Sequence, residues 1–480
     1  MKSFFTYENV VSIVLAVLTR RLILWLIKLL WDGFRSDLRN VPGPVLSRFT
    51  HLPLKLAVMQ GRRSLYIHAL HEQYGSYVRI SPDEVHTADI AAFRTIHRVG
   101  SDWNKGNFYE GQLPSQMNDE TAGVFGIQNN KTASPRRRLF QSAGTQKIVV
   151  EWEPQVKQLT ALALQKITHD LRTRGASDVM KWWTLMASDI TGSLAFGESF
   201  HNTENGERNR LVHDVEMLMP IIGVRTIMPW TKPIMDAIPT CYGKDAVQAT
   251  RAAQQGGGKT LFSKMVLDDE SEQAIPDSLI EKEATNVIVA GTDTTAMTLT
   301  YLVYAVLKNP DVKRKLVEEM KTCSTDPKWE ELESKSYLNN VIQETMRTHP
   351  AVPGTLVRKV PPGGENALKY RLPAGTEVGT QAWTFHHDPS VFEDPFEFKP
   401  ERWDDPTLLM KEYMMPFGGP TRMCVGRNIA RMSLLHATAV FFRECPDVGL
   451  AESTTEASME MVDYFAIKPR SGKCVVVSIS

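Results

Sequence analysis

Apolar residues recur at helical spacing in three long stretches of the chain. The first runs from Ser278 to Lys308. Ser278 and Glu281 have the spacing of a capping box at its start, and Asn309-Pro310 stops it. One-sided apolar positions predict a second helix from Tyr337 to Arg347, and steps of three and four predict a third from Arg427 to Phe442. The first, at about 30 residues and about 45 Å, is long enough to cross a whole domain.

Short stretches between the predicted helices have strand character and are bounded by Pro and Gly. Tyr77–Ile80 and Val85–Thr87 predict a hairpin, and three further strands are expected at Thr355–Val360, Glu377–Ala382 and Cys474–Ile479. The pattern as a whole predicts a mainly α fold with small β-sheets.

The N-terminus carries two apolar runs, Val10–Leu18 and Leu22–Trp31, separated by Thr19-Arg20-Arg21. As one helix, 22 residues span about 33 Å, enough to cross a hydrocarbon core. The two arginines would each cost about 2.5–3.5 kcal/mol at the bilayer centre, so a tilted or interfacial helix is an alternative. A helix buried in the protein core is another.

A proline-rich stretch, Val41-Pro42-Gly43-Pro44, cannot continue a helix. It divides the chain into an N-terminal membrane anchor and linker, residues 1–40, and a globular body, residues 41–480. Cations at Lys28, Arg35 and Arg39 predict that this domain lies on the cytoplasmic side.

The charge balance and the cysteine content bear on the class of partner and on the compartment of the protein. Lys+Arg and Asp+Glu are equal, at 55 each, so nothing favours a nucleic-acid partner. The five cysteines are scattered through 480 residues, which indicates a reducing compartment rather than a disulfide framework.

One cysteine, Cys424, lies in a Gly- and Pro-rich loop, Phe417 to Gly426, just before a predicted helix. Helix N-termini stabilise anions, so a thiolate is favoured there. An inert core cysteine is one alternative, and a nucleophile with His436 as its base is another. A zinc site would need further ligands at short spacing, which the sequence lacks. Haem iron needs only one axial ligand and a flat apolar slot.

A second unusual stretch, Ala290 to Thr295, interrupts the predicted long helix with Gly, Asp and three Thr. Glycine costs about 1 kcal/mol relative to Ala inside a helix, and Thr and Asp are also poor formers. A local rule broken in this way points to a functional site. The structural alternative is a threonine that bonds its own i−4 carbonyl.

Together these motifs resemble those of the cytochrome P-450 haem-thiolate monooxygenases. The Cys424 loop resembles the signature F-x-x-G-x-R-x-C-x-G, with Pro420 in place of the usual Gly, and Ala290–Thr295 resembles A/G-G-x-D/E-T-T. The resemblance implies a cytochrome P-450 fold in which Cys424 ligates the iron of haem b. Phe417, Arg422 and Gly426 would complete the cofactor loop.

On the distal side, the resemblance implies that Gly291 leaves room for O2, Thr294 anchors a proton-donating water and Asp293 relays protons. Glu344 and Arg347 resemble the family's E-x-x-R pair, and Arg402 belongs to its P-E-R-W segment. These three would form a buried charge network that fixes the cysteine loop.

Two arginines are the candidates for binding haem propionates. Arg137 follows Ser134-Pro135, which predicts a helix start, and resembles the arginine of a W/H-x-x-x-R helix in which Ala133 replaces the aromatic residue. Arg358 matches by its position in a predicted strand, and a guanidinium suits a carboxylate.

The resemblance implies a monooxygenase that inserts one atom of O2 into a hydrophobic small molecule, in secondary-metabolite biosynthesis. Electrons would come from NADPH through a separate flavoprotein reductase. The enzyme would bind membrane lipid at the cytoplasmic side of the endoplasmic reticulum. An O2-independent isomerase or dehydratase and a non-catalytic haem-binding protein are the alternatives. Five dispersed stretches are expected to line the substrate pocket: Phe108–Phe125, the methionine-rich Leu211–Trp230, Val287–Thr295, Ala351–Leu356 and Asp463–Phe465.

Overall fold

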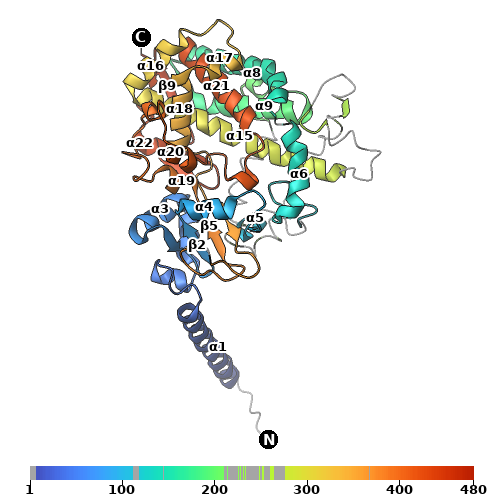
Figure 1. Ribbon diagram of the computed structural model, residues 1–480, viewed down its shortest axis with the longest axis vertical. Coiled ribbons are helices and arrows are strands. Elements are labelled where there is room, and N and C mark those ends of the chain that lie inside the picture. Colours follow the sequence, from blue (N-terminus) through green and yellow to red (C-terminus); the bar gives the residue numbers. More distant parts are fainter. Residues whose placement is uncertain are drawn as a thin grey trace.

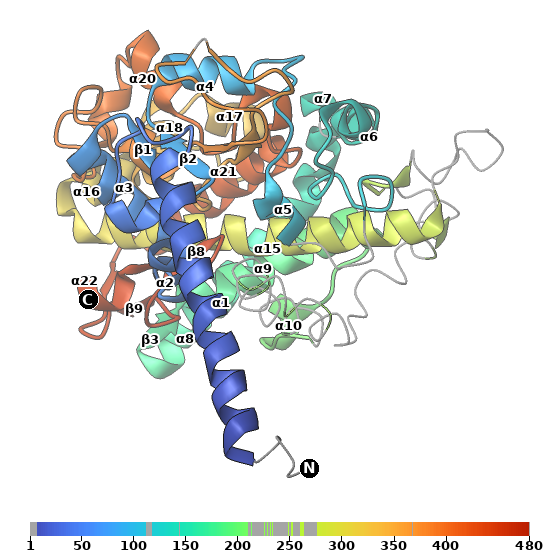
Figure 2. The ribbon, with the colours of Figure 1, turned by 90° about the horizontal axis from the view of Figure 1, so that it is seen from below.

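A computed structural model describes residues 7–111, 118–143, 145–209, 276–366 and 368–479, with a few isolated residues between 213 and 263. One long helix, α15 (Asp277–Lys308), crosses the whole body of the molecule, and the other elements are arranged around it (Figures 1 and 2). Apart from α15, the described helices are α1 Tyr7–Arg35, α2 Leu52–Met59, α3 Arg63–Tyr74, α4 Ile90–His97, α5 Asn107–Gly111, α6 Asn130–Ala143, α7 Gln146–Val149, α8 Glu153–Arg174, α9 Val179–Phe196, α10 Asn202–Asn205, α16 Pro310–Met320, α17 Trp329–Glu333, α18 Ser336–Thr348, α19 Ala382–His386, α20 Leu408–Tyr413, α21 Arg427–Glu444 and α22 Glu456–Met459.

The core lies where α8, α9, α15, α16, α18 and α21 pack together. Helix α9 is buried on nearly every side, as its almost uninterrupted apolar and small residues require. The second half of α15 is equally enclosed, with Leu299, Tyr301 and Leu302 each at most 1% exposed. Packing around its second half therefore fixes the position of α15 just beyond the unusual stretch in its middle.

Three small sheets accompany the helices. Strands β1 (Tyr77–Arg79), β2 (Glu84–Thr87), β5 (Glu377–Gly379) and β4 (Arg358–Lys359) form a four-stranded sheet in that order, in which only the β2–β5 pair is parallel. The other strands are β3 Ala176–Asp178, β9 Val475–Ser478 and β6 Val448–Leu450, which form one sheet, and β7 Met461–Asp463 and β8 Ile467–Pro469, which form a hairpin.

Most predicted elements are present. The three long predicted helices correspond to α15, α18 and α21, the hairpin to β1 and β2, and the tail strand to β9. The stretch predicted as a strand to Ala382 ends earlier, because α19 begins at that residue. A mainly helical fold with small sheets is confirmed.

Two predicted helix starts are wrong. Ser278 does not cap α15, which begins at Asp277 after Pro276 and has no side-chain cap. Helix α6 begins at Asn130, so Pro135 lies inside it rather than in its first turn. The earlier start is favoured because the Asn129 side chain accepts the N–H of Lys131 at 2.8 Å.

The N-terminal helix forms as predicted, and it projects away from the body (Figure 1). Large apolar side chains along it, such as Leu15 and Trp25, are more than half exposed, so the alternative of a buried core helix is wrong. The described residues include no helix long and apolar enough to cross a membrane, and a spanning anchor is not confirmed. The following Pro-Gly-Pro stretch docks on β1, since the Pro42 carbonyl accepts the N–H of Arg79 at 2.7 Å.

Candidate active site

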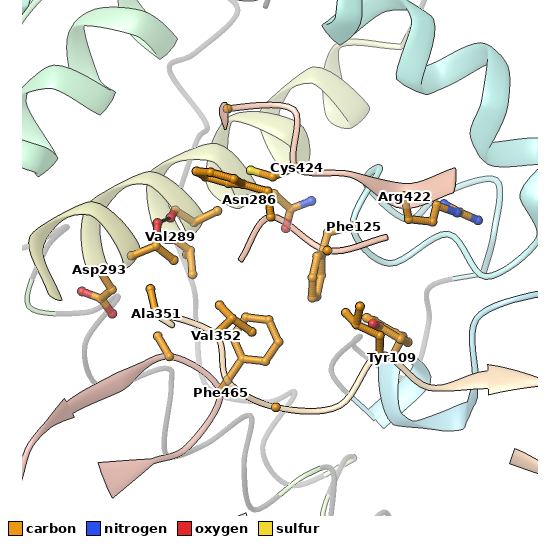
Figure 3. Close-up of a pocket in the computed structure, with 18 of the residues that line it drawn as sticks. Tyr109, Phe125, Asn286, Val289, Asp293, Ala351, Val352, Arg422, Cys424 and Phe465 are labelled. Atoms are coloured by element: carbon orange, nitrogen blue, oxygen red, sulfur yellow. Dashed lines mark hydrogen bonds between the residues drawn. The ribbon is translucent and has the colours of Figure 1, made fainter. Parts of the chain in front are cut away.

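A single cavity of about 1030 Å³ brings the predicted motifs together. Its lining includes Cys424, Asp293 and Thr294, and Figure 3 shows Cys424 across the cavity from Phe465 and from Ala351 and Val352. Among the described residues, every predicted lining stretch contributes to it. Most of the predicted methionine-rich stretch lies outside the described residues.

The cysteine loop has a conformation that presents sulfur to the cavity. The N–H of Cys424 donates to the Phe417 carbonyl at 2.9 Å, which closes the loop upon itself. Gly418 has φ +81°, a left-handed conformation that a side chain would strain. Gly426 precedes α21, and a Cβ added there would lie 3.9 Å from Cys424 Sγ. The loop therefore needs Gly418 for its turn, whereas a side chain at Gly426 would make only an ordinary van der Waals contact with sulfur.

Pro420, the one departure from the family signature, fits this loop. It occupies the first position of a short 3-10 helix, Pro420–Arg422, where a missing N–H costs nothing. The preceding Gly419 lies so close to α4 that an added Cβ would be 2.8 Å from His97 Cβ. Thr421 Oγ1 also donates to the His97 carbonyl at 2.8 Å. The proline thus leaves the loop docked on the end of α4.

The predicted charge network is confirmed. Arg347 donates through Nε and Nη2 to the two oxygens of Glu344 at 2.9 and 2.8 Å, and both side chains are 0% exposed. Arg402 Nε donates to the same carboxylate at 3.0 Å, as does Trp403 Nε1 at 2.9 Å. One carboxylate therefore joins α18 to the segment that precedes the cysteine loop.

His386 connects this network to the loop. Arg347 Nη1 donates to its backbone carbonyl at 2.9 Å, and its ring Nε2 accepts the N–H of Met415 at 2.9 Å. Burial beside Arg347 lowers the pKa of His386 to about 3, so the ring is neutral and can accept. The Met415 carbonyl then accepts the N–H of Gly418. The network thus reaches the cysteine loop through a chain of hydrogen bonds.

The surroundings of the Cys424 thiol act on its pKa in opposite directions. Burial raises the pKa of Cys424, and the Gly426 N–H and the charges of Arg137 and Arg427 oppose this without reversing it. The side chain of Cys424 lies in the cavity, just before the first turn of α21. The N-terminus of α21 and the two arginines are the groups that favour the thiolate form.

On α15, Gly291 allows a close approach of α9. A Cβ added there would lie 2.6 Å from Thr191 Oγ1 on α9. The missing side chain therefore allows close packing of the two helices. Gly291 also lines the cavity, and its predicted role of leaving room for O2 stays a prediction. The sequence motif Ala290–Thr295 did not indicate this contact, because Thr191 lies a hundred residues earlier in the chain.

Thr294 adopts the local bond weighed as the structural alternative. Its Oγ1 donates to the Ala290 carbonyl at 2.7 Å, while the residue lines the cavity. Because the proton is engaged, the hydroxyl offers the cavity only its lone pairs. Asp293 also lines the cavity, and Figure 3 shows it projecting from α15.

Four buried or half-buried cations gather at one side of the cavity. Arg422, Arg137 and Arg358 were predicted, and Lys105 was missed. Burial and the three guanidiniums hold the pKa of Lys105 well below its usual range, and burial with Arg358 and Arg137 lowers the pKa of Arg422 to about 10. The only signal for Lys105 in the sequence is a lone cation in the aromatic stretch 103–109.

The bonds of these cations do not neutralise them. Arg137 Nη2 donates to the Met423 carbonyl at 2.5 Å, Arg358 Nη1 to the Val357 carbonyl, and Lys105 Nζ to the Phe125 carbonyl. Among the residues that the structure describes, Arg422 Nη1 is buried without a hydrogen-bond partner. Like charges held together in this way are unfavourable unless an anion joins them. Two carboxylates of a haem, next to a cysteine ligand, fit this side of the cavity.

Comparison with known proteins agrees with this geometry. The sequence profile of the family Cytochrome P450 matches residues 41–469. The cytochrome P450 monooxygenase tazI of Aspergillus terreus is 36% identical to this chain, over 96% of this chain and 98% of its own length. The cytochrome P450 monooxygenases aflV of Aspergillus parasiticus and stcB of Emericella nidulans are each 32% identical, over 94% and 92% of this chain and 93% and 89% of their own.

Profile and relatives cover nearly the whole chain, and the family's cysteine loop, Ala-Gly-x-Asp-Thr-Thr helix and Glu-x-x-Arg network face or support one cavity. The chain therefore belongs to the cytochrome P450 family and is a cytochrome P450 monooxygenase.

Proposed function

We propose that the cavity holds haem b with Cys424 as the iron ligand and oxidises a hydrophobic small molecule of secondary metabolism. The observation that carries this proposal is the opposition of the Cys424 loop and the Asp293-Thr294 stretch across one largely apolar cavity. When bound, the haem iron supplies reductive activation of O2.

The cations at the side of the cavity would hold the propionates. Arg422 contributes the unpartnered Nη1, and Arg137 and Arg358 add guanidiniums that suit carboxylate geometry. Lys105 would be the fourth member, since its charge is otherwise unfavourable among the three arginines. Phe417 backs the loop by packing against the main core.

Thr294 and Asp293 would manage protons on the substrate side. With its own proton on the Ala290 carbonyl, Thr294 Oγ1 can accept a hydrogen bond from a water in the cavity and so fix its position. Asp293, one residue earlier on α15, is the group that would replace the proton given up by that water.

Residues 1–40 are proposed as a membrane-associated segment and residues 41–480 as the catalytic domain, on the cytoplasmic side of the endoplasmic reticulum. Support comes from α1, whose exposed apolar side chains suit an interfacial helix. Electrons would arrive from NADPH through a separate flavoprotein reductase.

The experiment that tests this proposal is spectroscopic and stoichiometric. Reduced, carbon monoxide-treated wild-type protein should show the red-shifted Soret band of thiolate ligation. The Cys424→Ser variant should lack this band. Consumption of NADPH and O2 in step with product supports the monooxygenase. Product formed without O2 would instead support an isomerase or dehydratase, and haem binding without any turnover would support a carrier.

A further inference from the structure

A short loop, Gly123–Phe125, lines the cavity and is held at two neighbouring peptide groups. The N–H of Val124 points at both carboxylate oxygens of Glu283 on α15, at 2.8 and 3.0 Å. From the other side, Lys105 Nζ donates to the Phe125 carbonyl at 2.5 Å. The two ends of one dipeptide are thus bonded to an anion and a cation on separate elements.

The loop also lies directly against α15. A Cβ added at Gly123 would be 2.0 Å from Asn286 Nδ2 and 2.9 Å from Glu283 Oε2. The backbone of Gly123 is outside the left-handed region, so the glycine is required for this approach rather than for its conformation. A side chain at this position would displace the ends of the Asn286 and Glu283 side chains or push the loop away from α15.

This arrangement fixes the ring of Phe125. The ring centroid lies 5.6 Å from that of Phe465 and 5.6 Å from that of Tyr109, and Lys105 Nζ lies 4.6 Å from it. Figure 3 shows Phe125 projecting into the cavity between Cys424 and Phe465. The loop therefore supplies an aromatic wall whose position depends on backbone bonds.

Burial of the Glu283 carboxylate is energetically unfavourable. Glu283 is 0% exposed, and its nearest cation, Arg136, is 3.6 Å away. Burial raises the pKa of Glu283 to about 7. It lies ten residues before Asp293 on the same helix, about 15 Å along the axis, so the proton chemistry of Thr294 and Asp293 does not explain it. Glu283 instead contacts the N–H of Val124 in the loop and the side chain of Arg136.

We propose that Glu283 is a positioning residue for substrate recognition: it clamps the Gly123–Phe125 loop so that Phe125 forms a fixed wall that selects bulky aromatic ligands. This inference rests on the proposed function of the cavity as the substrate site. The clamp acts on the size and shape of the ligand, so it affects bulky ligands and leaves iron coordination by small ones unchanged.

Hydrogen exchange of the full-length holoprotein tests the clamp directly. In Glu283→Ala, the amides of residues 118–127 should exchange at least tenfold faster, which corresponds to about 1.4 kcal/mol of lost protection. Glu283→Gln keeps an acceptor oxygen for Val124 and should stay near wild type. Glu281→Ala is the matched control, because Glu281 is on the same helix, partly exposed and outside the cavity lining.

Ligand binding tests the consequence. Imidazole and clotrimazole, an imidazole that carries three aryl rings, both coordinate haem iron, but only the second is large enough to reach the aromatic wall. Glu283→Ala should weaken clotrimazole binding at least tenfold and change imidazole binding less than twofold, as measured by Soret shifts. Gly123→Ala, which acts from the loop side, should reproduce this pattern.

The outcomes separate the two proposals. A wild-type protein without the red-shifted Soret band overturns the haem-thiolate function, while hydrogen exchange still reports on the loop. An intact band together with unchanged exchange and an unchanged clotrimazole-to-imidazole ratio in Glu283→Ala overturns the clamp alone. Equal losses for both azoles would also overturn it, since they would indicate general damage to the haem site.

Discussion

Replacement of Glu344 by Gln should destabilise the folded protein by about 3–5 kcal/mol, because it leaves a buried guanidinium without its counter-charge. Glu344 accepts two bonds from Arg347 and one each from Arg402, Trp403 and the backbone N–H of Lys399. Arg347 is 0% exposed and keeps only carbonyl partners after the change, which satisfy its N–H groups but do not neutralise it. The penalty should therefore be that of an uncompensated buried charge.

Urea denaturation followed by circular dichroism measures this loss, and the red-shifted Soret fraction reports on the cysteine loop. The matched control is Glu401→Gln, whose carboxylate lies 2.6 Å from Lys315 Nζ but is 41% exposed, so its loss should cost less than about 1 kcal/mol. If Glu344→Gln lowers the free energy of unfolding no more than Glu401→Gln does, burial is not the reason that the Glu344 network stabilises the fold. If stability falls but the Soret fraction does not, the chain of bonds through His386 does not support the loop.

Three further predictions concern α15. Gly291→Ala should lower stability because its Cβ meets Thr191, and adding Thr191→Ala, which leaves only a 3.5 Å Cβ contact, should restore most of it in the same denaturation assay. Thr294→Ala should uncouple NADPH consumption from product and release hydrogen peroxide, measured by oxygen and peroxide assays; unchanged coupling would contradict its proton role. Glu283 has a pKa raised from 4.5 to about 7, so its ionisation costs the fold up to about 3 kcal/mol as pH rises through this window. Glu283→Gln should therefore gain stability relative to wild type between pH 5 and 8, and a constant difference would refute the raised pKa.

Local pattern predicted much of the architecture. Helices α15, α18 and α21 could be placed within a few residues, because apolar periodicity and an Asn-Pro stop act within a few turns of the chain. The first residues of helices were harder to predict from the sequence, because capping depends on which side chain reaches a free backbone N–H. Asn129, not Ser134, occupies that position for α6.

The sequence by itself determined the cysteine loop and the Asp293-Thr294 stretch, because each depends on residue types at short, characteristic spacing. The Glu344 network was implied by the family resemblance, since its Arg402 lies 58 residues further along the chain. Tertiary structure alone decided what lies opposite them. Gly291 meets Thr191, Lys105 joins three arginines, and Val124 bonds Glu283 across 159 residues of chain. Such contacts arise from the packing of whole elements, whose relative positions depend on the entire core and leave no periodic trace in either partner's neighbourhood.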